Sequence, residues 1–282
     1  MSNLKTGLAE CVRLCAGKNA IERLCLGIEW EQPLNQRTMA ELSALSQEIT
    51  DLPRRIEFRS SEKLVEEATQ GRESLSFEEE SELVEIVLDN RQSAEDSKDD
   101  KTLEIKISSQ GFFFQLLAST YISWTDTKQK AASLTSTLLN RILEERPVNS
   151  VGLQVIDSLS FDRNLDFSEI LDEKSEYLPK AVFSKHAYWR VDQSYYEADD
   201  HATAALTNFQ IVHTPKDEGY DNLVIACLHR ADLVEATKLS SEDMYQRYDA
   251  LYRMNKSLVS SLLSEKLGKL IGIIKEGDSY GS

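Results

Sequence analysis

Few residues in this sequence could cross-link or interrupt the chain. Four cysteines and five prolines occur in 282 residues, and no two cysteines are spaced CxxC. This argues against a disulfide framework and fits a reducing compartment. No apolar run of about 18 residues is present and the N-terminal stretch has no apolar signal core, so we expect a cytoplasmic protein without a membrane span.

Signature motifs of phosphate binding and covalent catalysis are also missing. The 11 glycines are scattered, and the patterns GxGxxG, GxxxxGK(S/T) and GxSxG do not occur. A loop that cradles phosphate needs closely spaced glycines, so we expect no nucleotide or other cofactor. A nucleophile and a histidine could still meet in space, but no spacing in the sequence favours such a pair.

Positive charge is scarce relative to negative charge. The chain has 32 Lys and Arg against 48 Asp and Glu, which gives a formal net charge of −16. This balance disfavours direct binding to nucleic acid or an anionic membrane and favours a basic protein partner. Residues 73–100 hold eleven acids against two basic residues. We interpret them as an acidic insertion, either a solvated loop or a surface for that partner.

Hydrophobic residues make up 41% of the chain and mostly follow a two-residue period. The clearest pattern predicts a long strand over 111–124, then a helix capped by Asp126, and after Pro147 a second strand. No regular βαβ alternation is present. We therefore predict an α+β fold of mostly antiparallel sheets with helices on one face. It has two strand-rich halves, 1–147 and 148–282, each closed by a helix.

Helical spacing is less common than strand spacing. Residues 1–18 and 62–71 are predicted to be short helices, and a long terminal helix begins at about Ser241 behind a capping box of Ser240 and Asp243. That helix would be about 45 Å long, longer than a small domain is wide. Its late section carries a second apolar stripe. We predict that this stripe is a homo-oligomer interface, formed by Leu263, Leu267, Leu270 and Ile274.

One charged residue interrupts the apolar face of the strand that follows Pro147. Asp157 falls in the same alternating row as Val155 and Leu159. A carboxylate in that position must be hydrogen-bonded, paired, or at an opening in the core. Asp157 is therefore a candidate catalytic residue, and a structural hydrogen bond is the alternative.

A second catalytic candidate is the pair Glu104 and Lys106, which alternate on one predicted strand after an acidic segment. Carboxylates that hold Mg²⁺ beside a lysine are typical of metal-dependent nucleases. The alternative is a solvated strand face with alternating charges.

Two further groups of residues are candidates for binding. Asp199, Asp200 and His201 form an acidic and imidazole cluster, but the spacings of common metal sites are absent, so we predict no metal site. The side chains that could line a ligand or partner surface are His186, Tyr188 and Arg190. Ordinary strand packing is the alternative for these three.

Four segments occur in the order seen in a known family. They are an early strand (IERLCLGIEW), an aromatic strand ending in tryptophan (FFFQLLASTYISW) with a helix after it, the strand VGLQVIDSLSF, and a final helix with YDALYRMNKSLVSSLLSEKL. Together they resemble a patchily distributed bacterial family of α+β proteins with no assigned activity. In that family the third strand reads leucine, arginine, tyrosine, hydrophobic, asparagine. The matching residues here are Leu153, Gln154, Val155, Ile156 and Asp157.

The arginine, tyrosine and asparagine positions of that pattern are all changed in this chain. The resemblance implies an intracellular bacterial protein without an assigned activity. A patchy distribution implies an accessory role, such as phage defence or another conflict with mobile elements.

Three hypotheses about function follow. The first is a non-catalytic interaction or assembly subunit of the bacterial cytosol, homo-oligomeric through its C-terminal helix. The second is a metal-dependent nuclease or hydrolase that uses Asp157 or the strand with Glu104 and Lys106. The third is a sensor that binds a small ligand between sheet and helix. We favour a non-enzymatic role, because the sequence shows no catalytic constellation.

Overall fold

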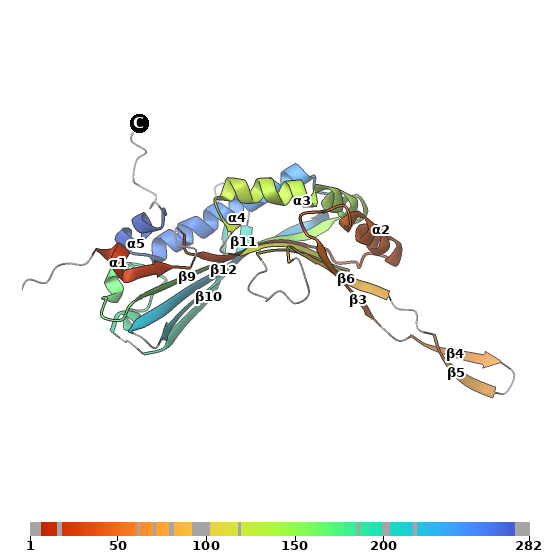
Figure 1. Ribbon diagram of the computed structural model, residues 1–282, viewed down its shortest axis with the longest axis horizontal. Coiled ribbons are helices and arrows are strands. Elements are labelled where there is room, and N and C mark those ends of the chain that lie inside the picture. Colours follow the sequence, from red (N-terminus) through yellow and green to blue (C-terminus); the bar gives the residue numbers. More distant parts are fainter. Residues whose placement is uncertain are drawn as a thin grey trace, which may run out of the picture.

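The computed structural model describes residues 7–15, 19–60, 63–69, 72–78, 82–91, 102–117, 120–184, 187–198, 204–216 and 219–273. Most of these residues belong to one large antiparallel sheet, which helices cover on one face (Figure 1). The α+β class predicted from the sequence is confirmed in this form.

The main sheet has ten strands in the order β10–β11–β12–β9–β2–β8–β7–β6–β3, with β1 beside one end of β9. Their bounds are β1 Val12–Leu14, β2 Ile21–Glu29, β3 Arg54–Ser60, β6 Glu82–Asp89, β7 Leu103–Ser108, β8 Gly111–Leu117, β9 Val148–Asp162, β10 Trp189–Ala198, β11 Ala204–Pro215 and β12 Tyr220–Thr237. Alternation of apolar and polar residues explains these strands, because one face is buried and the other is not.

Two strands form the centre of the sheet. β2 and β9 are paired antiparallel, and Gly27 of β2 lies opposite Gly152 of β9. β8 flanks β2, and β12 flanks β9. Apart from β1, strands before Pro147 lie on one side of this pair and strands after it on the other. The chain therefore builds one continuous main sheet from strands of both predicted halves, 1–147 and 148–282.

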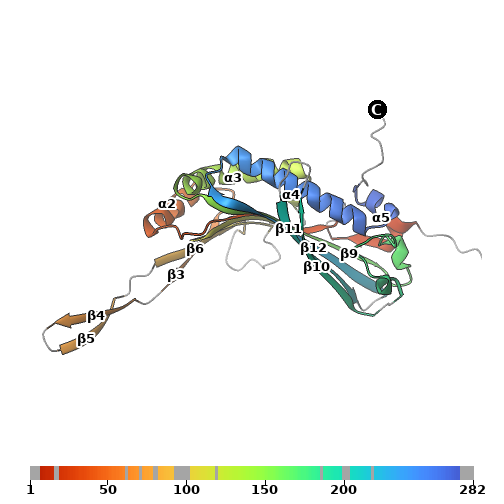
Figure 2. The same ribbon diagram turned by 180° about the vertical axis from the view of Figure 1, so that it is seen from behind.

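The helices lie on the same face of the sheet (Figures 1 and 2). Their bounds are α1 Leu8–Cys11, α2 Gln36–Ser46, α3 Trp124–Glu145, α4 Ser241–Leu262 and α5 Glu265–Leu270, with 3-10 turns at Phe167–Glu169 and Lys180–Ser184. Among the residues that the structure describes, none of the helices has both the length and the apolar composition needed to cross a membrane.

α4 joins two hydrophobic clusters. Its first half contributes Met244 and Leu251 to a cluster with β2, β8 and α3. Its second half contributes Leu258 and Leu262 to another cluster, under β10–β12. The predicted capping box is present at its start, where Ser240 and Asp243 exchange side-chain to backbone hydrogen bonds. The helix thus crosses the sheet over both halves of the chain.

The predicted long strand over 111–124 is shorter in the structure. β8 ends at Leu117, and α3 begins at Trp124. Ser123 caps this helix, in place of the predicted Asp126, because its hydroxyl accepts the backbone N–H of Asp126 at 3.1 Å. Trp124 therefore leaves the row of strand residues and packs against α4.

The terminal helix is interrupted, and the predicted interface stripe is buried. Leu263 has an extended backbone and bridges to Leu171, and Ser264 then caps α5. This turn directs the stripe into the chain's own core, where Leu263 is 1% and Leu267 0% exposed. Leu270 is half-buried against the same cluster. Ile274 lies outside the described residues.

Two segments predicted as helices contain strands. Within residues 1–18, α1 is a single turn and β1 then pairs with β9. Within residues 62–71, Lys63–Thr69 forms β4, which pairs with β5, Arg72–Glu78, as a separate two-stranded sheet. Figure 1 draws this hairpin beyond β3. Short apolar runs fit both periods, so pairing with a later segment decides between them.

Candidate binding cavity beside Asp157

Asp157 lies near the middle of β9, and its side chain faces the helices. The residue is 7% exposed. It lines a cavity of about 450 Å³ between β9, the start of β2, the start of α3, the middle of α4 and the residues that follow α5. The other lining residues are Asn19, Ala20, Ile21, Tyr121, Ile122, Ser123, Trp124, Thr125, Val155, Tyr252, Asn255, Lys256, Ile271, Gly272 and Ile273.

The Asp157 carboxyl has no hydrogen bond or ion pair within the described part of the chain. Burial alone raises its pKa to about 7. Burial replaces water around the carboxyl group by apolar surroundings. Without a hydrogen-bond partner or counter-ion, the ionised form is therefore disfavoured relative to the protonated form. Of the three situations that the sequence left open, the structure shows an opening in the core.

Three aromatic residues, Trp124, Tyr252 and Tyr121, form one wall of this cavity. Trp124 stacks on Tyr252 with ring centroids 4.3 Å apart, and the Tyr121 and Tyr252 hydroxyls are 3.0 Å apart. Burial raises the pKa of both tyrosines, and the nearby Asp157 adds to this shift. Lys128 lies over the Trp124 ring and Lys256 over the Tyr252 ring. Each outer face of the stacked pair therefore already carries a cation.

Asp249 of α4 fixes the position of this wall. It accepts a hydrogen bond from Trp124 Nε1 at 2.6 Å, and it pairs with Lys128 Nζ at 2.7 Å. Both donors belong to α3. The two helices are thus joined beside the cavity, and the joint holds the Trp124 ring in place.

Asn255 forms another part of the cavity and is anchored from behind. Its Oδ1 lies 3.3 Å from His229 Nε2, and His229 Nδ1 lies 2.9 Å from the Thr207 hydroxyl. Burial lowers the pKa of His229 to about 4, so the ring is neutral at pH 7. This buried chain of side chains runs from α4 across β12 to β11.

The other catalytic candidates lie on the opposite face of the sheet. Lys106 Nζ is 2.6 Å from Glu85 Oε2. Glu104 pairs in register with Asp89, which Arg54 and Arg91 hold in ion pairs. Side chains of β7 that face this way cannot meet Asp157, whose side chain faces the helices.

No group of three or more His, Cys, Asp or Glu able to hold a metal ion occurs among the described residues. The metal candidates Asp199, Asp200 and His201 lie outside the described residues, as does His186. Of the predicted binding surface, Tyr188 is 61% exposed, and Arg190 is paired with Asp192 at 2.6 Å. These two residues are at the surface, and their role stays a prediction.

Sequence reasoning missed a buried hydrogen-bonded pair. His213 Nε2 is 2.9 Å from Asp221 Oδ2, and both side chains are fully buried. Arg163 Nε donates to the same carboxylate at 2.9 Å. His213 Nδ1 also faces a carbonyl oxygen, that of Ala187. The signal in the sequence was His213 in the apolar row of β11, which is the same kind of break that revealed Asp157.

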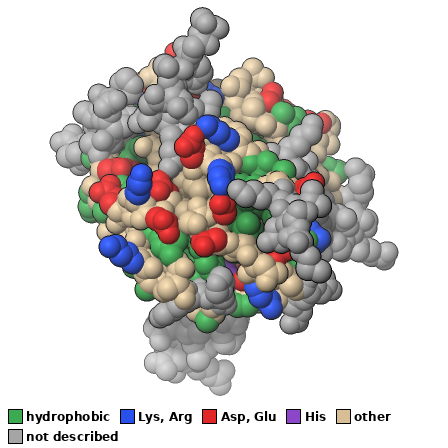
Figure 3. All heavy atoms as spheres, turned by 90° about the vertical axis from the view of Figure 1, so that its left-hand side faces the viewer, with side chains coloured by type: hydrophobic (Ala, Val, Ile, Leu, Met, Phe, Trp, Pro, Cys, Tyr) green, Lys and Arg blue, Asp and Glu red, His purple; other side chains and the backbone are tan. Residues whose placement is uncertain are grey.

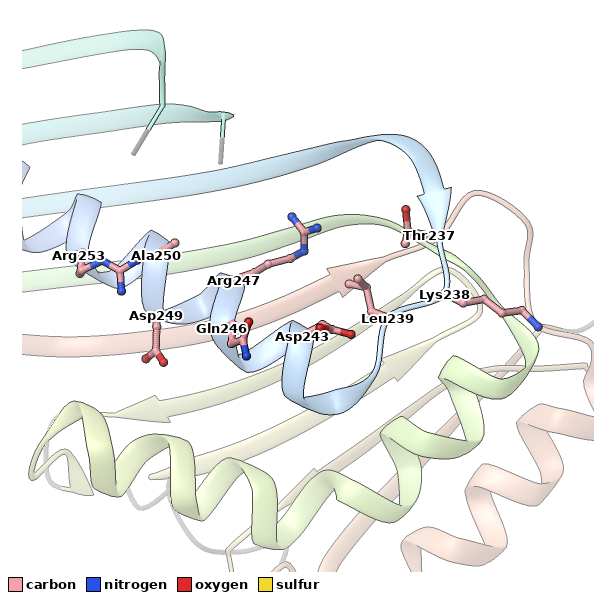
Figure 4. A pocket seen from close by; sticks show the side chains of 9 residues that line it. All are labelled: Thr237, Lys238, Leu239, Asp243, Gln246, Arg247, Asp249, Ala250 and Arg253. Atoms are coloured by element: carbon pink, nitrogen blue, oxygen red, sulfur yellow. The ribbon is translucent and has the colours of Figure 1, made fainter. Parts of the chain in front are cut away.

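A larger hollow of about 640 Å³ lies at the corner between β12 and α4 (Figure 4). Figure 4 shows the Arg247 and Arg253 side chains pointing in different directions. Asp243 belongs to the capping box, and Asp249 is held by Lys128. The polar groups of this hollow therefore do not converge on one point, whereas those of the Asp157 cavity do.

Charge is mixed at the end of the molecule where β9–β12 and α5 lie. Figure 3 shows acidic and basic side chains interspersed on this end, without a large patch of one sign in the described part. Ion pairs such as Lys266 with Glu169 account for part of this pattern. The Asp157 cavity is therefore the best candidate site in the described residues.

Comparison with known proteins identifies no relative from which a function could be inferred. No family model, no curated protein and no solved structure matches this chain at a significant level. The resemblance to a bacterial family therefore stays a prediction, and the cavity must carry the functional argument.

Proposed function

We propose that this protein binds a small ligand in the Asp157 cavity, between β9 and the helices, and acts as a sensor. One observation carries the proposal, namely a buried carboxyl group without a partner in the described chain at a cavity of about 450 Å³. Burying an unpaired carboxylate costs several kcal/mol, and a ligand with a hydrogen-bond donor would offset that cost. Cavities of about 300–1,000 Å³ are typical of small-molecule sites.

The elements around the cavity support a sensor role. A ligand there would contact α3, α4 and the end of α5 together, since Trp124, Asn255 and Ile271 all line the cavity. It would stabilise the packing of these helices on the sheet by binding the folded state. Ile122 is 80% exposed at the cavity, and an apolar ligand would cover it.

The test is a fragment screen read by nuclear magnetic resonance. The chain has three tryptophans, and only Trp124 lines the cavity, whereas Trp30 is buried in the main core. We expect compounds that shift the indole N–H signal of Trp124 and leave that of Trp30 unchanged. A screen of several hundred diverse fragments without one such compound would contradict the proposal.

A second candidate, the interaction or assembly subunit, is favoured by the face of the sheet opposite the helices. No described helix covers this face (Figures 1 and 2). A hollow of about 300 Å³ lies at its centre, lined by Phe113, Leu228 and Arg230 among others. Gly27 and Gly152 form its floor. Since α5 is packed inward, this face is the surface we propose for a partner or a second copy.

Light scattering tests that second candidate. Leu228→Glu places a charge in the hollow, so we expect it to lower the mass of any homo-oligomer. Ser158→Glu is the matched control, because Ser158 lies on β9 at the same face of the sheet but outside the hollow. Equal masses for wild type and both variants would show that this hollow is not a homo-oligomer interface. The protein partner, the bacterial cytosol and the role in phage defence stay predictions.

We also infer that the halves 1–147 and 148–282 are two versions of one unit. Each has a central strand, β2 or β9, which is followed by strands that return beside it and by a long helix, α3 or α4. Co-expression of the two halves as separate chains tests whether each half is a folding unit of its own. They should co-purify, because the β2–β9 ladder joins them, and two halves that purify apart would contradict the inference.

A further inference from the structure

The charges around the Asp157 cavity identify the class of its ligand, if the proposed function holds. Of the residues that line the cavity, only Asp157 and Lys256 carry charge. Lys256 is exposed, and its Nζ lies 5.9 Å from the Tyr252 ring centroid. This places Lys256 at the outer side of the aromatic pair, where it forms no ion pair with Asp157. The cavity therefore presents one negative group without a counter-ion from the described chain.

The second lysine near the aromatic pair, Lys128, forms an ion pair away from Asp157. Its Nζ is 2.7 Å from Asp249. Asp126 is close enough to act on the Tyr121 hydroxyl, as Asp157 does, since both raise the pKa of that tyrosine beyond the effect of burial. The surroundings of the cavity are thus more negative than positive. Together with a net charge of −16, this favours a cation over an anion.

A metal ion does not fit this cavity. Mg²⁺ and Ca²⁺ take about six or more oxygen ligands, usually from several carboxylates. Here one carboxylate is accompanied by neutral groups, and no metal-binding group of three or more His, Cys, Asp or Glu occurs in the described residues. An ammonium group needs fewer partners, because its two or three N–H bonds can be shared between a carboxylate and neutral oxygens.

Neutral oxygens of that kind line the same cavity. They belong to the hydroxyls of Tyr121 and Tyr252. The remaining wall is apolar, with Ile21, Ile122, Ile271 and Ile273 among its residues. We infer that the ligand is a protonated organic amine with an apolar body, whose N–H groups donate to Asp157 and whose hydrocarbon part lies along the isoleucines.

Binding of such an amine depends on pH. The amine pairs with the ionised carboxyl, and burial raises the pKa of Asp157 to about 7. The groups that face it are the Tyr121 and Tyr252 hydroxyls, the Cys227 thiol on the next strand and Lys256 at the cavity. Burial raises the pKa of the two tyrosines and the cysteine, so these three stay neutral at pH 7. We expect affinity about thirtyfold weaker at about pH 5.5 than at about pH 8.

The experiment uses the full chain and three probes of similar shape, which are 2-phenylethylamine, 2-phenylethanol and 3-phenylpropionate. Binding is measured at the Trp124 indole N–H signal. We expect the amine to bind more tightly than the other two. Asp157→Asn, which keeps the shape of the side chain, should weaken amine binding at least tenfold at about pH 8. Asp192→Asn, at the exposed surface of β10, is the matched control and should bind as wild type does.

The outcomes separate this inference from the function on which it rests. If the alcohol or the carboxylate shifts the Trp124 signal as strongly as the amine, the inference that the ligand is a cation is wrong. The same holds if Asp157→Asn leaves amine binding unchanged. In both cases the proposal that the cavity binds a ligand is retained. If amine affinity does not fall between about pH 8 and pH 5.5, the ion pair with Asp157 is also wrong. If none of the three probes shifts Trp124, the amine is overturned, and the fragment screen then decides on the site itself.

Discussion

Replacing Asp157 with asparagine should change how stability depends on pH. The folded protein holds the pKa of this carboxyl at about 7, against an ordinary value of 3.8. Between these values the unfolded chain has lost the proton and the folded chain keeps it, so stability falls as pH rises. One pKa unit corresponds to about 1.4 kcal/mol, so wild type loses about 3 kcal/mol between about pH 5 and pH 8 from this group. An asparagine side chain does not titrate, so the Asp157→Asn variant lacks that loss.

A second buried group acts in the opposite direction. The folded protein lowers the pKa of His229 to about 4, from an ordinary value of 6.5. Below that ordinary value the unfolded chain binds a proton first, so stability falls as pH decreases. Between about pH 5 and pH 6.5 this amounts to about 2 kcal/mol. The slopes of Asp157 and His229 therefore oppose each other in wild type, and Asp157→Asn should expose the histidine slope.

The assay is urea unfolding followed by circular dichroism at several values between about pH 5 and pH 8. The quantity to compare is the free energy of unfolding of Asp157→Asn minus that of wild type. We expect this difference to increase by about 3 kcal/mol across the range. Asp192→Asn is the control, because hydrogen bonds from Arg190 lower the pKa of Asp192 and keep it ionised throughout the range. A difference for Asp157→Asn that is constant with pH would refute the reasoning.

Three further substitutions test the packing. Leu267→Ala should lower the free energy of unfolding by about 2–5 kcal/mol, because the side chain is buried in the chain's own core. Gly27→Ala should cost about 1–3 kcal/mol, since its new Cβ would lie 2.9 Å from the Phe113 ring. Ser240→Ala should cost about 1 kcal/mol through loss of the α4 cap. All three are measured by chemical unfolding at about pH 7.

Each of these substitutions has a control or a contrary outcome. For Leu267→Ala, unfolding unchanged together with a lower oligomer mass would show that the stripe faces a partner after all. Gly152→Ala is the control for Gly27→Ala, because its nearest neighbour, the His229 carbonyl oxygen, is 3.8 Å away. Equal losses for the two glycines would contradict the contact with Phe113. A loss for Ser240→Ala that Ser241→Ala reproduces would not come from the cap.

Strands and helices were predictable where one face of an element is buried throughout. The alternation of β7, β9 and β12 is read correctly from the sequence, and so is the capping box of α4. Residues 63–69 were misread as helical because their pairing with residues 72–78 lies outside a short window. Leu263 was misread because Ser264 ends the helical repeat and begins another helix. In both cases a contact with residues beyond the local sequence pattern determines the structure. These contacts are the pairing of β4 with β5 and the bridge between Leu263 and Leu171.

Of the residues that form the candidate site, the sequence alone predicted one. Asp157 is visible in the sequence because it breaks the apolar row of its own strand. Tyr121, Tyr252 and Asn255 show no such break, since aromatic and polar residues are ordinary at a helix boundary or on a half-buried helix face. They meet only because α4 crosses β9 and stacks Tyr252 on Trp124 of α3. That convergence comes from the packing of segments more than 100 residues apart.

The path of α4 across both hydrophobic clusters has a thermodynamic consequence. Neither cluster is complete without this helix, since Leu251 belongs to one and Leu258 to the other. The halves of the chain should therefore melt in a single transition, because loosening either cluster releases α4 from both. Tyr252 and Asn255 lie between those two leucines and line the cavity. A ligand held there would thus protect amide hydrogens from exchange in strands at both ends of the sheet, far from any atom it touches.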